Sequence, residues 1–296
     1  MASVMGVDSA TPRSGWDERN QDAGGGMSAR VRAAGAKHQD LTSLVEGEII
    51  PRLLVAHCHG DGPRSNPGPS EILPAEAEAF ARLPLTLEAD ELFERVEQFL
   101  DRGVTPGSIL LYLLAPSARE LGKLWEEDVC SFVDVTMGLW RLQEVMRELR
   151  WRAPPSLDRK MEERSALFAG MPGEQHSFGT LMINDLFSRA GWHSEALIEP
   201  TTKELLAIIE ARPLDLIGLT LSCDCPSGNV RKLIKAIRSV SYNPQIRVMI
   251  GGRVVNENPS LVGDSGADGT APDAQSALAF AECLIRGTQR LAAIAG

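Results

Sequence analysis

The chain has 296 residues, a formal net charge of −10 and 43% hydrophobic residues. This length can bury one large core or two modest ones, and the acidic charge argues against strong DNA binding by the chain alone. No apolar run approaches the roughly 20 residues of a membrane span, and no signal peptide opens the chain. The five cysteines are scattered and compatible with reduced thiols. We therefore expect a cytoplasmic protein that does not enter a membrane.

The first half of the chain is predicted to be helical. Residues 1–38 are rich in Gly, Ala, Ser and charge and are expected to form a disordered tail. Residues 39–153 are expected to form a helical cap bundle, interrupted by a Pro- and Gly-rich flexible insert over 59–84. Helical spacing of apolar residues predicts four helices, over 41–57, 88–101, 106–127 and 132–151.

The second half, residues 162–296, alternates short apolar runs with helical patterns. This alternation predicts a doubly wound, parallel, five-stranded sheet with the flavodoxin-like order 2-1-3-4-5. The predicted strands cover 166–171, 194–198, 215–221, 246–250 and 267–271. In that order the loops after strands one, three and four meet at one edge of the sheet, which is where such sheets bind ligands.

Those three loops carry residues suited to a large ligand. His176 lies in the loop Gly-Glu-Gln-His-Ser-Phe-Gly after the first strand. A neutral imidazole is a suitable axial metal ligand, and Glu174 can accept a hydrogen bond from its other ring nitrogen. Thr220-Leu-Ser222 ends the third strand and offers short hydroxyls, and Gly251-Gly252 ends the fourth and leaves room close to the backbone.

Taken together, the three loops resemble the signature of the cobalamin-binding domain family, Asp-x-His-x-x-Gly, Ser-x-Leu and Gly-Gly, over residues 162–296. The chain departs from it at Glu174, Thr220 and Ser222, where the family has Asp, Ser and Leu. The resemblance implies adenosyl- or hydroxocobalamin with His176 as the cobalt ligand. The remaining residues that it implies around the cofactor are Gln175, Ser177, Phe178, Gly179, Leu221, Gly251, Gly252 and Thr270.

The segment 121–128, Leu-Gly-Lys-Leu-Trp-Glu-Glu-Asp, resembles the capping helix of CarH-type photoreceptors. The resemblance implies that Trp125 covers the upper face of the corrin. The alternative is that Trp125 is a core residue of the bundle, because Leu121 and Leu124 complete the usual helical spacing. CarH-type proteins carry Glu-His about ten residues after the tryptophan, whereas this chain has Val135-Thr136.

A capped cobalamin domain without a DNA-binding module resembles the AerR/PpaA antirepressors. That resemblance implies a light-responsive regulator, not an enzyme, that acts on a CrtJ/PpsR-type repressor of photosystem genes and reaches DNA only through this partner. Two alternatives stay open. The first is a haem-binding redox sensor of the same fold, in which His176 binds iron. The second is a corrinoid protein that serves a methyltransferase.

Overall fold

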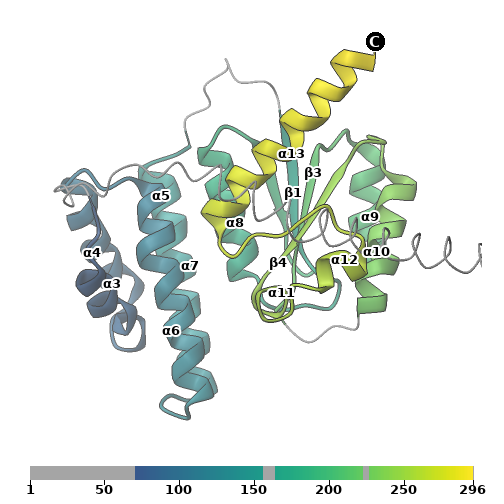
Figure 1. Ribbon diagram of the computed structural model, residues 1–296. Helices are drawn as coiled ribbons and strands as arrows, with labels where there is room; N and C mark the ends of the chain where they lie inside the picture. Colours follow the sequence, from purple (N-terminus) through teal and green to yellow (C-terminus); the bar gives the residue numbers. More distant parts are fainter. Residues whose placement is uncertain (1–70, 156–163, 223–226, 296) are drawn as a thin grey trace, which may run out of the picture. The chain divides into compact units, whose positions relative to one another are not determined.

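Four parallel strands form the centre of the second half in the computed structural model, which describes residues 71–155, 164–222 and 227–295 (Figure 1). They are β1 (Ser165–Gly170), β2 (His193–Leu197), β3 (Leu216–Thr220) and β4 (Arg247–Gly251), in the spatial order β2-β1-β3-β4. Strands β1 and β3 are almost entirely buried, as their apolar sequences require when helices cover both faces of a sheet. The predicted strand order is confirmed.

The fifth strand, expected over 267–271, is the one error in the predicted sheet. It is reduced to a single parallel bridge between Met249 and Gly269. The N–H of Val248 donates instead to the carboxylate of Asp268, at 2.7 Å, so a side chain takes a place that a backbone carbonyl would fill in a longer strand. A charged side chain therefore accepts the hydrogen bond that a fifth strand would accept through its backbone. The pattern of apolar residues in the sequence cannot predict such a replacement.

Helices cover the sheet on both faces (Figure 1). One face packs on α9 (Thr202–Ala211) and α10 (Ser227–Val240), with the short helices α11 (Arg253–Glu257) and α12 (Leu261–Ser265) beside them. The other face packs on α8 (Phe178–Arg189) and α13 (Ala274–Ala295). Among the described residues, no helix is long and apolar enough to cross a membrane.

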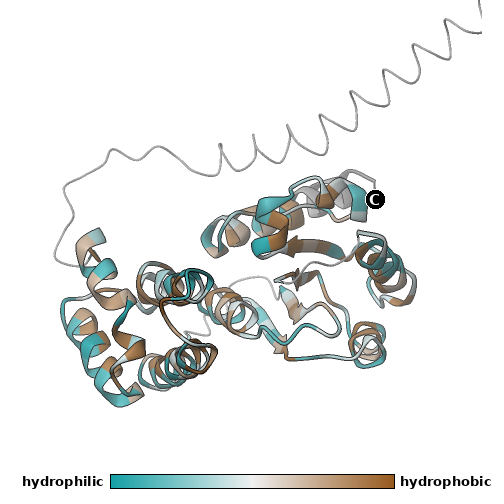
Figure 2. Cartoon of the chain, turned by 90° about the horizontal axis from the view of Figure 1, so that it is seen from below, coloured by the Kyte–Doolittle hydropathy of each residue, from teal (hydrophilic) through white to brown (hydrophobic). Residues whose placement is uncertain are grey.

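The helical half consists of α3 (Pro74–Ala81), α4 (Ala89–Asp101), a long helical segment and α7 (Phe132–Arg152). The long segment runs through α5 (Pro106–Ile109), the π-helical turn η3 (Leu110–Leu114) and α6 (Ala115–Glu126). Figure 2 shows apolar residues gathered between these helices, where buried leucines form a common core. The helices predicted over 88–101, 106–127 and 132–151 are confirmed.

The prediction of a flexible insert over 59–84 was wrong for its last part, which holds α3 and the 3₁₀ turn η2 (Leu83–Leu85). Pro74 occupies the first turn of α3, where a missing N–H costs nothing. The Glu76 carboxylate accepts from the N–H of Leu73 at 2.9 Å, and Phe80 is buried. Among the described residues, the fourth helix of the bundle is therefore α3. The helix expected over 41–57, the tail and residues 59–70 lie outside the described part.

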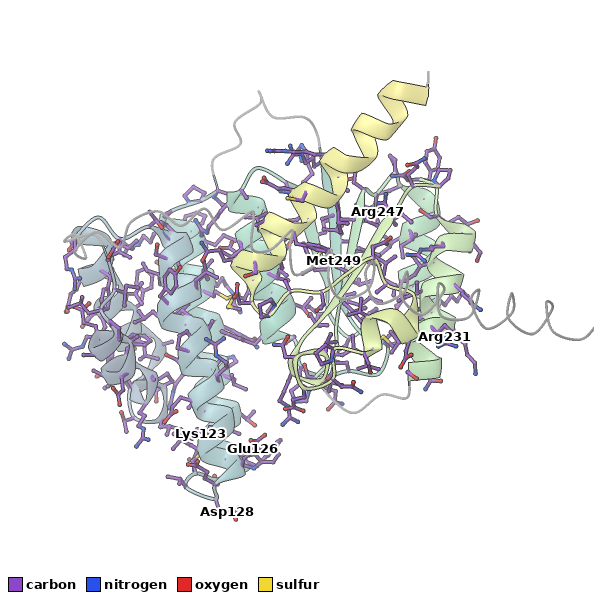
Figure 3. All side chains as sticks on the ribbon, viewed as in Figure 1. Lys123, Glu126, Asp128, Arg231, Arg247 and Met249 are labelled. Atoms are coloured by element: carbon purple, nitrogen blue, oxygen red, sulfur yellow. The ribbon has the colours of Figure 1, made fainter. Side chains whose placement is uncertain are left out.

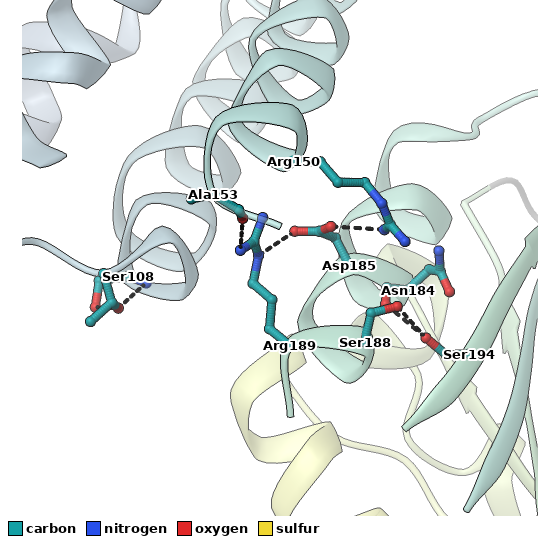
Figure 4. A network of polar contacts seen from close by, with 9 residues as sticks. Ser108, Arg150, Ala153, Asn184, Asp185, Ser188, Arg189 and Ser194 are labelled. Atoms are coloured by element: carbon teal, nitrogen blue, oxygen red, sulfur yellow. Dashed lines mark hydrogen bonds and ion pairs between the residues drawn. The ribbon is translucent and has the colours of Figure 1, made fainter. Parts of the chain in front are cut away.

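Helix α8 joins the two halves, and all described residues lie in one compact unit, Leu44–Gly296. Leu186 and Met182 of α8 pack into the core of the bundle, whereas Phe187 packs against the sheet. The buried Asp185 accepts from Arg150 of α7 at 2.9 Å and from Arg189 at 2.6 Å (Figure 4). Arg189 also donates to the carbonyl of Ala153 at 2.7 Å. These contacts hold the end of α7 on α8.

Candidate functional site at the carboxyl edge of the sheet

The loop between β1 and α8 carries an exposed histidine whose ring contacts a buried carboxylate. Gly173 has φ +92°, a left-handed conformation that favours glycine, and the N–H of Glu174 closes the turn on the carbonyl of Met171 at 2.8 Å. The side chain of His176 is 61% exposed, whereas that of Glu174 is 4% exposed. The imidazole is thus held at Nδ1 by the buried carboxylate, and the rest of the ring is accessible to solvent.

Glu174 connects two of the three loops. One of its carboxylate oxygens accepts from the backbone N–H of His176 at 3.2 Å and forms a short contact with Nδ1 of the same residue. Its other oxygen accepts from the backbone N–H of Ser222 at 3.0 Å. An ionised carboxylate can only accept, so the proton of the imidazole is assigned to Nδ1. This assignment places the lone pair on Nε2, the form in which imidazole binds a metal.

The loops meet as the strand order requires, because Gly170, Thr220 and Gly251 are paired across the last row of the sheet. Gly252 has φ +104°, and a Cβ atom there would lie 2.4 Å from the carbonyl oxygen of Leu221, so only glycine fits. A Cβ atom on Gly251 would meet nothing within 4 Å. At Gly252 the chain therefore lies close to the backbone of Leu221, whereas the space beside Gly251 is open.

The other predicted residues are divided between the site and the cores. Gln175 and Gly179 are exposed, and Ser177 is half-buried. Phe178 is half-buried and packs on the core of the bundle. The side chain of Leu221 lies in the core on the α9–α10 face, so only its backbone contributes to the loop. The hydroxyl of Thr270 is buried and has no hydrogen-bond partner among the described residues.

Two contacts at this edge were missed from the sequence. The hydroxyl of Thr180, in the first turn of α8, lies 2.7 Å from the hydroxyl of Thr220. Arg253, directly after the diglycine, pairs with Glu126 at the end of α6 at 2.8 Å. Figure 3 shows Glu126 close to the tip of the bundle. Both contacts join residues far apart in the chain, and no local pattern in the sequence signals them.

The tip of the bundle carries an exposed aromatic pair. Trp125 is 47% exposed and meets Phe132 edge to face, with ring centroids 6.4 Å apart. Because Leu121 and Leu124 are buried while Trp125 is half exposed, the alternative of a core tryptophan is not supported. Phe132 precedes Arg150 by eighteen residues, or five turns of helix, so both project from the side of α7 that faces α8. The pair thus lies on the sheet side of the bundle.

Comparison with known proteins gives the family. Two family models, each described as a B12 binding domain, match residues 164–279 and 76–150 and together span more than half of the chain. The chain belongs to the B12-binding domain family. Its B12-binding domains coincide with the sheet and with the helical bundle that packs on it.

Individual relatives are distant. The chain is 24% identical over 172 residues to an uncharacterized 20.5 kDa protein from the bchF-crtJ intergenic region of Rhodobacter capsulatus, a match that covers 58% of this chain and 89% of the relative. These matches are consistent with an AerR/PpaA-type cobalamin-binding protein. The monomethylamine corrinoid protein of Methanosarcina barkeri is 16% identical, with a TM-score of 0.57 over 68% of this chain and 93% of its own, and shares the fold. A cobalamin-binding protein from Desulfitobacterium hafniense DCB-2 is 17% identical over 71% of this chain and 98% of its own, with a TM-score of 0.38.

The residues present fit a corrinoid. Such a cofactor needs an axial nitrogen, room beside the backbone and polar partners for its nucleotide tail. His176 supplies the nitrogen, and Gly251 borders open space. The buried hydroxyl of Thr270 supplies a polar group that the described residues leave unsatisfied, as expected where a ligand completes a site.

We predict that Glu174→Ala weakens cobalamin binding by about 10- to 100-fold, the loss typical of residues that orient a metal ligand. Without the carboxylate, the imidazole of His176 loses its orientation and the N–H of Ser222 loses its acceptor. Affinity is measured by titration with hydroxocobalamin. The matched control is Glu195→Ala on β2, whose carboxylate is exposed. Equal affinity of the two variants would contradict the role of Glu174.

Proposed function

We propose that this protein is a cobalamin-binding, light-responsive regulator of transcription, without enzymatic activity, that acts as an antirepressor on a CrtJ/PpsR-type repressor. The observation that supports the proposal is the ion pair between Arg253, directly after the diglycine, and Glu126, next to Trp125, which links the aromatic tip of the bundle to the carboxyl edge of the sheet. The location of the Rhodobacter relative in the bchF-crtJ intergenic region supports the link to photosynthesis genes.

In this proposal His176 would hold the cobalt, and Trp125 with Phe132 would shield the cofactor on the side of the bundle. A bound alkylcobalamin would supply a bond that light can break. The aromatic tip would then make different contacts in the dark and illuminated forms. Only such a difference in contacts between two states can shift a conformational equilibrium. The pairs Arg253–Glu126 and Arg150–Asp185 connect the bundle to the sheet, so a shift of the tip is expected to change this seam.

The first test is spectroscopic. Protein loaded with adenosylcobalamin in the dark is expected to show the spectrum of an alkylcobalamin whose cobalt has a nitrogen ligand from the protein, and to change to a hydroxo- or aquocobalamin spectrum after illumination. The purified protein is also examined without added cofactor. A sharp haem Soret band from tightly bound haem would contradict the proposal and favour the haem-binding alternative.

The second test concerns the partner. A net charge of −10 favours approach to a basic surface, such as the DNA-binding side of a repressor. The dark and illuminated forms are therefore expected to release the repressor from operator DNA to different extents in a gel-shift assay. Equal effects of both forms and of apo His176→Ala would remove the sensing role.

A variant of the cap separates sensing from binding. Trp125→Ala is expected to alter the light response more than the affinity for cobalamin, because the aromatic pair would shield the cofactor and would not hold its metal. The matched control is Tyr242→Ala, which removes another exposed aromatic side chain after α10. An unchanged light response of Trp125→Ala would contradict the role of the tip.

A further inference from the structure

Helix α7 carries an exposed stripe that the bundle does not use. Its residues follow one another at spacings of four, three, four, three and four, which is the spacing of a seam between two paired helices. The stripe, here called the outer stripe, consists of Val133, Met137, Trp140, Glu144, Arg147 and Trp151. Trp140 is 49% and Trp151 is 81% exposed, whereas Leu142, Val145 and Leu149 on the opposite side are buried. Large apolar side chains so exposed on one helix face mark an interaction surface.

The charges in the outer stripe indicate what covers it. Glu144 and Arg147 lie between the two tryptophans and pair with each other at 2.7 Å. If a second copy of α7 packs antiparallel, with the twofold axis between residues 145 and 146, Glu144 lies opposite Arg147 of the second copy. The same register places Trp140 opposite Trp151. A parallel arrangement would instead place like charges opposite each other, which is unfavourable.

We propose that this protein forms a homodimer through antiparallel packing of two α7 helices along the part of the outer stripe from Trp140 to Trp151. Such an interface is isologous, because the same patch on each copy meets itself and every contact is made twice. Each copy contributes two tryptophans to stack across the seam and two charges to fix its register. The stripe is therefore complementary to itself, and this complementarity selects a second copy of the chain as its partner.

The outer stripe is separate from the proposed cofactor cap. Successive residues of a helix are rotated by about 100°, so Val133 projects from a different side of α7 than its neighbour Phe132. Phe132 projects from the same side of α7 as Arg150, which pairs with Asp185 of α8. The outer stripe projects from a neighbouring side of α7. The dimer thus goes beyond the proposed function and does not depend on it.

The expected dimer is weak. One pair of helices buries less than the roughly 1,200 Å² at which stable interfaces begin, so dissociation is expected at micromolar concentrations. Sedimentation equilibrium over a range from about 1 to 200 μM should therefore show both monomer and dimer. A wild-type protein that stays monomeric over the whole range would overturn the proposal.

Two charge reversals test the register. Glu144→Arg places arginine opposite arginine, and Arg147→Glu places glutamate opposite glutamate, so each variant alone is expected to raise the dissociation constant at least tenfold. An equimolar mixture of the two is expected to form a heterodimer, because both cross-helix pairs then join opposite charges. Each variant lacks the internal Glu144–Arg147 pair, so recovery in the mixture reports contact between copies. Dimerisation of the single variants like wild type, or a mixture that stays monomeric, would overturn the proposal.

A third variant controls for loss of an ion pair within the helix. Glu148→Arg removes the ion pair between Glu148 and Arg152. This pair lies on the side of α7 that faces α4, because Arg152 also pairs with Glu97 of α4. This variant is expected to dimerise like wild type, and circular dichroism verifies the helical content of all three. Equal loss of the dimer in the control would attribute the effect to the helix and overturn the assignment of the outer stripe.

Discussion

His176→Ala is expected to abolish stable binding of cobalamin while both halves of the chain stay folded. The imidazole supplies the axial nitrogen of the proposed site, so its loss exceeds the effect of removing Glu174, which only orients it. The side chain is 61% exposed, and the backbone N–H groups of residue 176 and Ser222 still donate to the Glu174 carboxylate in the variant, so the fold should be retained. Absorbance of the protein after gel filtration with hydroxocobalamin measures retention.

His193→Ala is the matched control for this prediction. His193 is the other histidine of the described residues and lies exposed at the start of β2, at the edge of the sheet opposite to the three loops. It should retain cobalamin with the wild-type spectrum. Retention by His176→Ala with an unchanged spectrum would show that His176 is not the ligand.

Asp185→Ala is expected to lower the free energy of unfolding by about 3 kcal/mol, because removal of one partner from a buried ion pair leaves the other uncompensated. The side chain of Asp185 is 4% exposed and that of Arg189 is 13% exposed, so water replaces the lost carboxylate poorly. Arg150 loses its contact with α8 as well, which loosens α7 on the sheet half. Urea denaturation followed by circular dichroism measures the loss.

The control for Asp185→Ala is Glu195→Ala, which also removes two hydrogen bonds to a carboxylate, in this case both from Arg212 on the surface. Water screens that pair, so its loss should cost no more than about 1 kcal/mol. A similar, small loss in both variants would mean that the contact between α7 and α8 depends on apolar packing alone.

Most of the fold could be predicted from the sequence, because the patterns that indicate its strands and helices are local. Each predicted strand end and helix start lies where apolar runs meet turn residues. One example is Ser131, which caps α7 and accepts from the N–H of Asp134 at 3.2 Å. The strand order then brought the three loops together without further information. The identity of the site residues therefore followed from spacing, and their meeting followed from topology.

What could not be predicted depends on contacts between distant residues. The segment before helix α3 is rich in proline, which is typical of a linker, yet Phe80 in this helix is buried. Glu76 accepts a hydrogen bond from Arg102, which follows it by 26 residues. The end of the sheet depends on the carboxylate of Asp268, and the reach of Glu174 to Ser222 spans 48 residues. A pattern within one segment contains none of these pairings.

The position of α8 has a thermodynamic consequence. The helix begins directly after the histidine loop, and its two faces pack on the bundle and on the sheet. Occupancy of the loop and docking of the bundle therefore involve the same helix. If occupancy favours docking, then docking favours occupancy by the same factor. Native-state hydrogen exchange of α7 amides should then slow on ligand binding, although α7 itself holds no metal ligand.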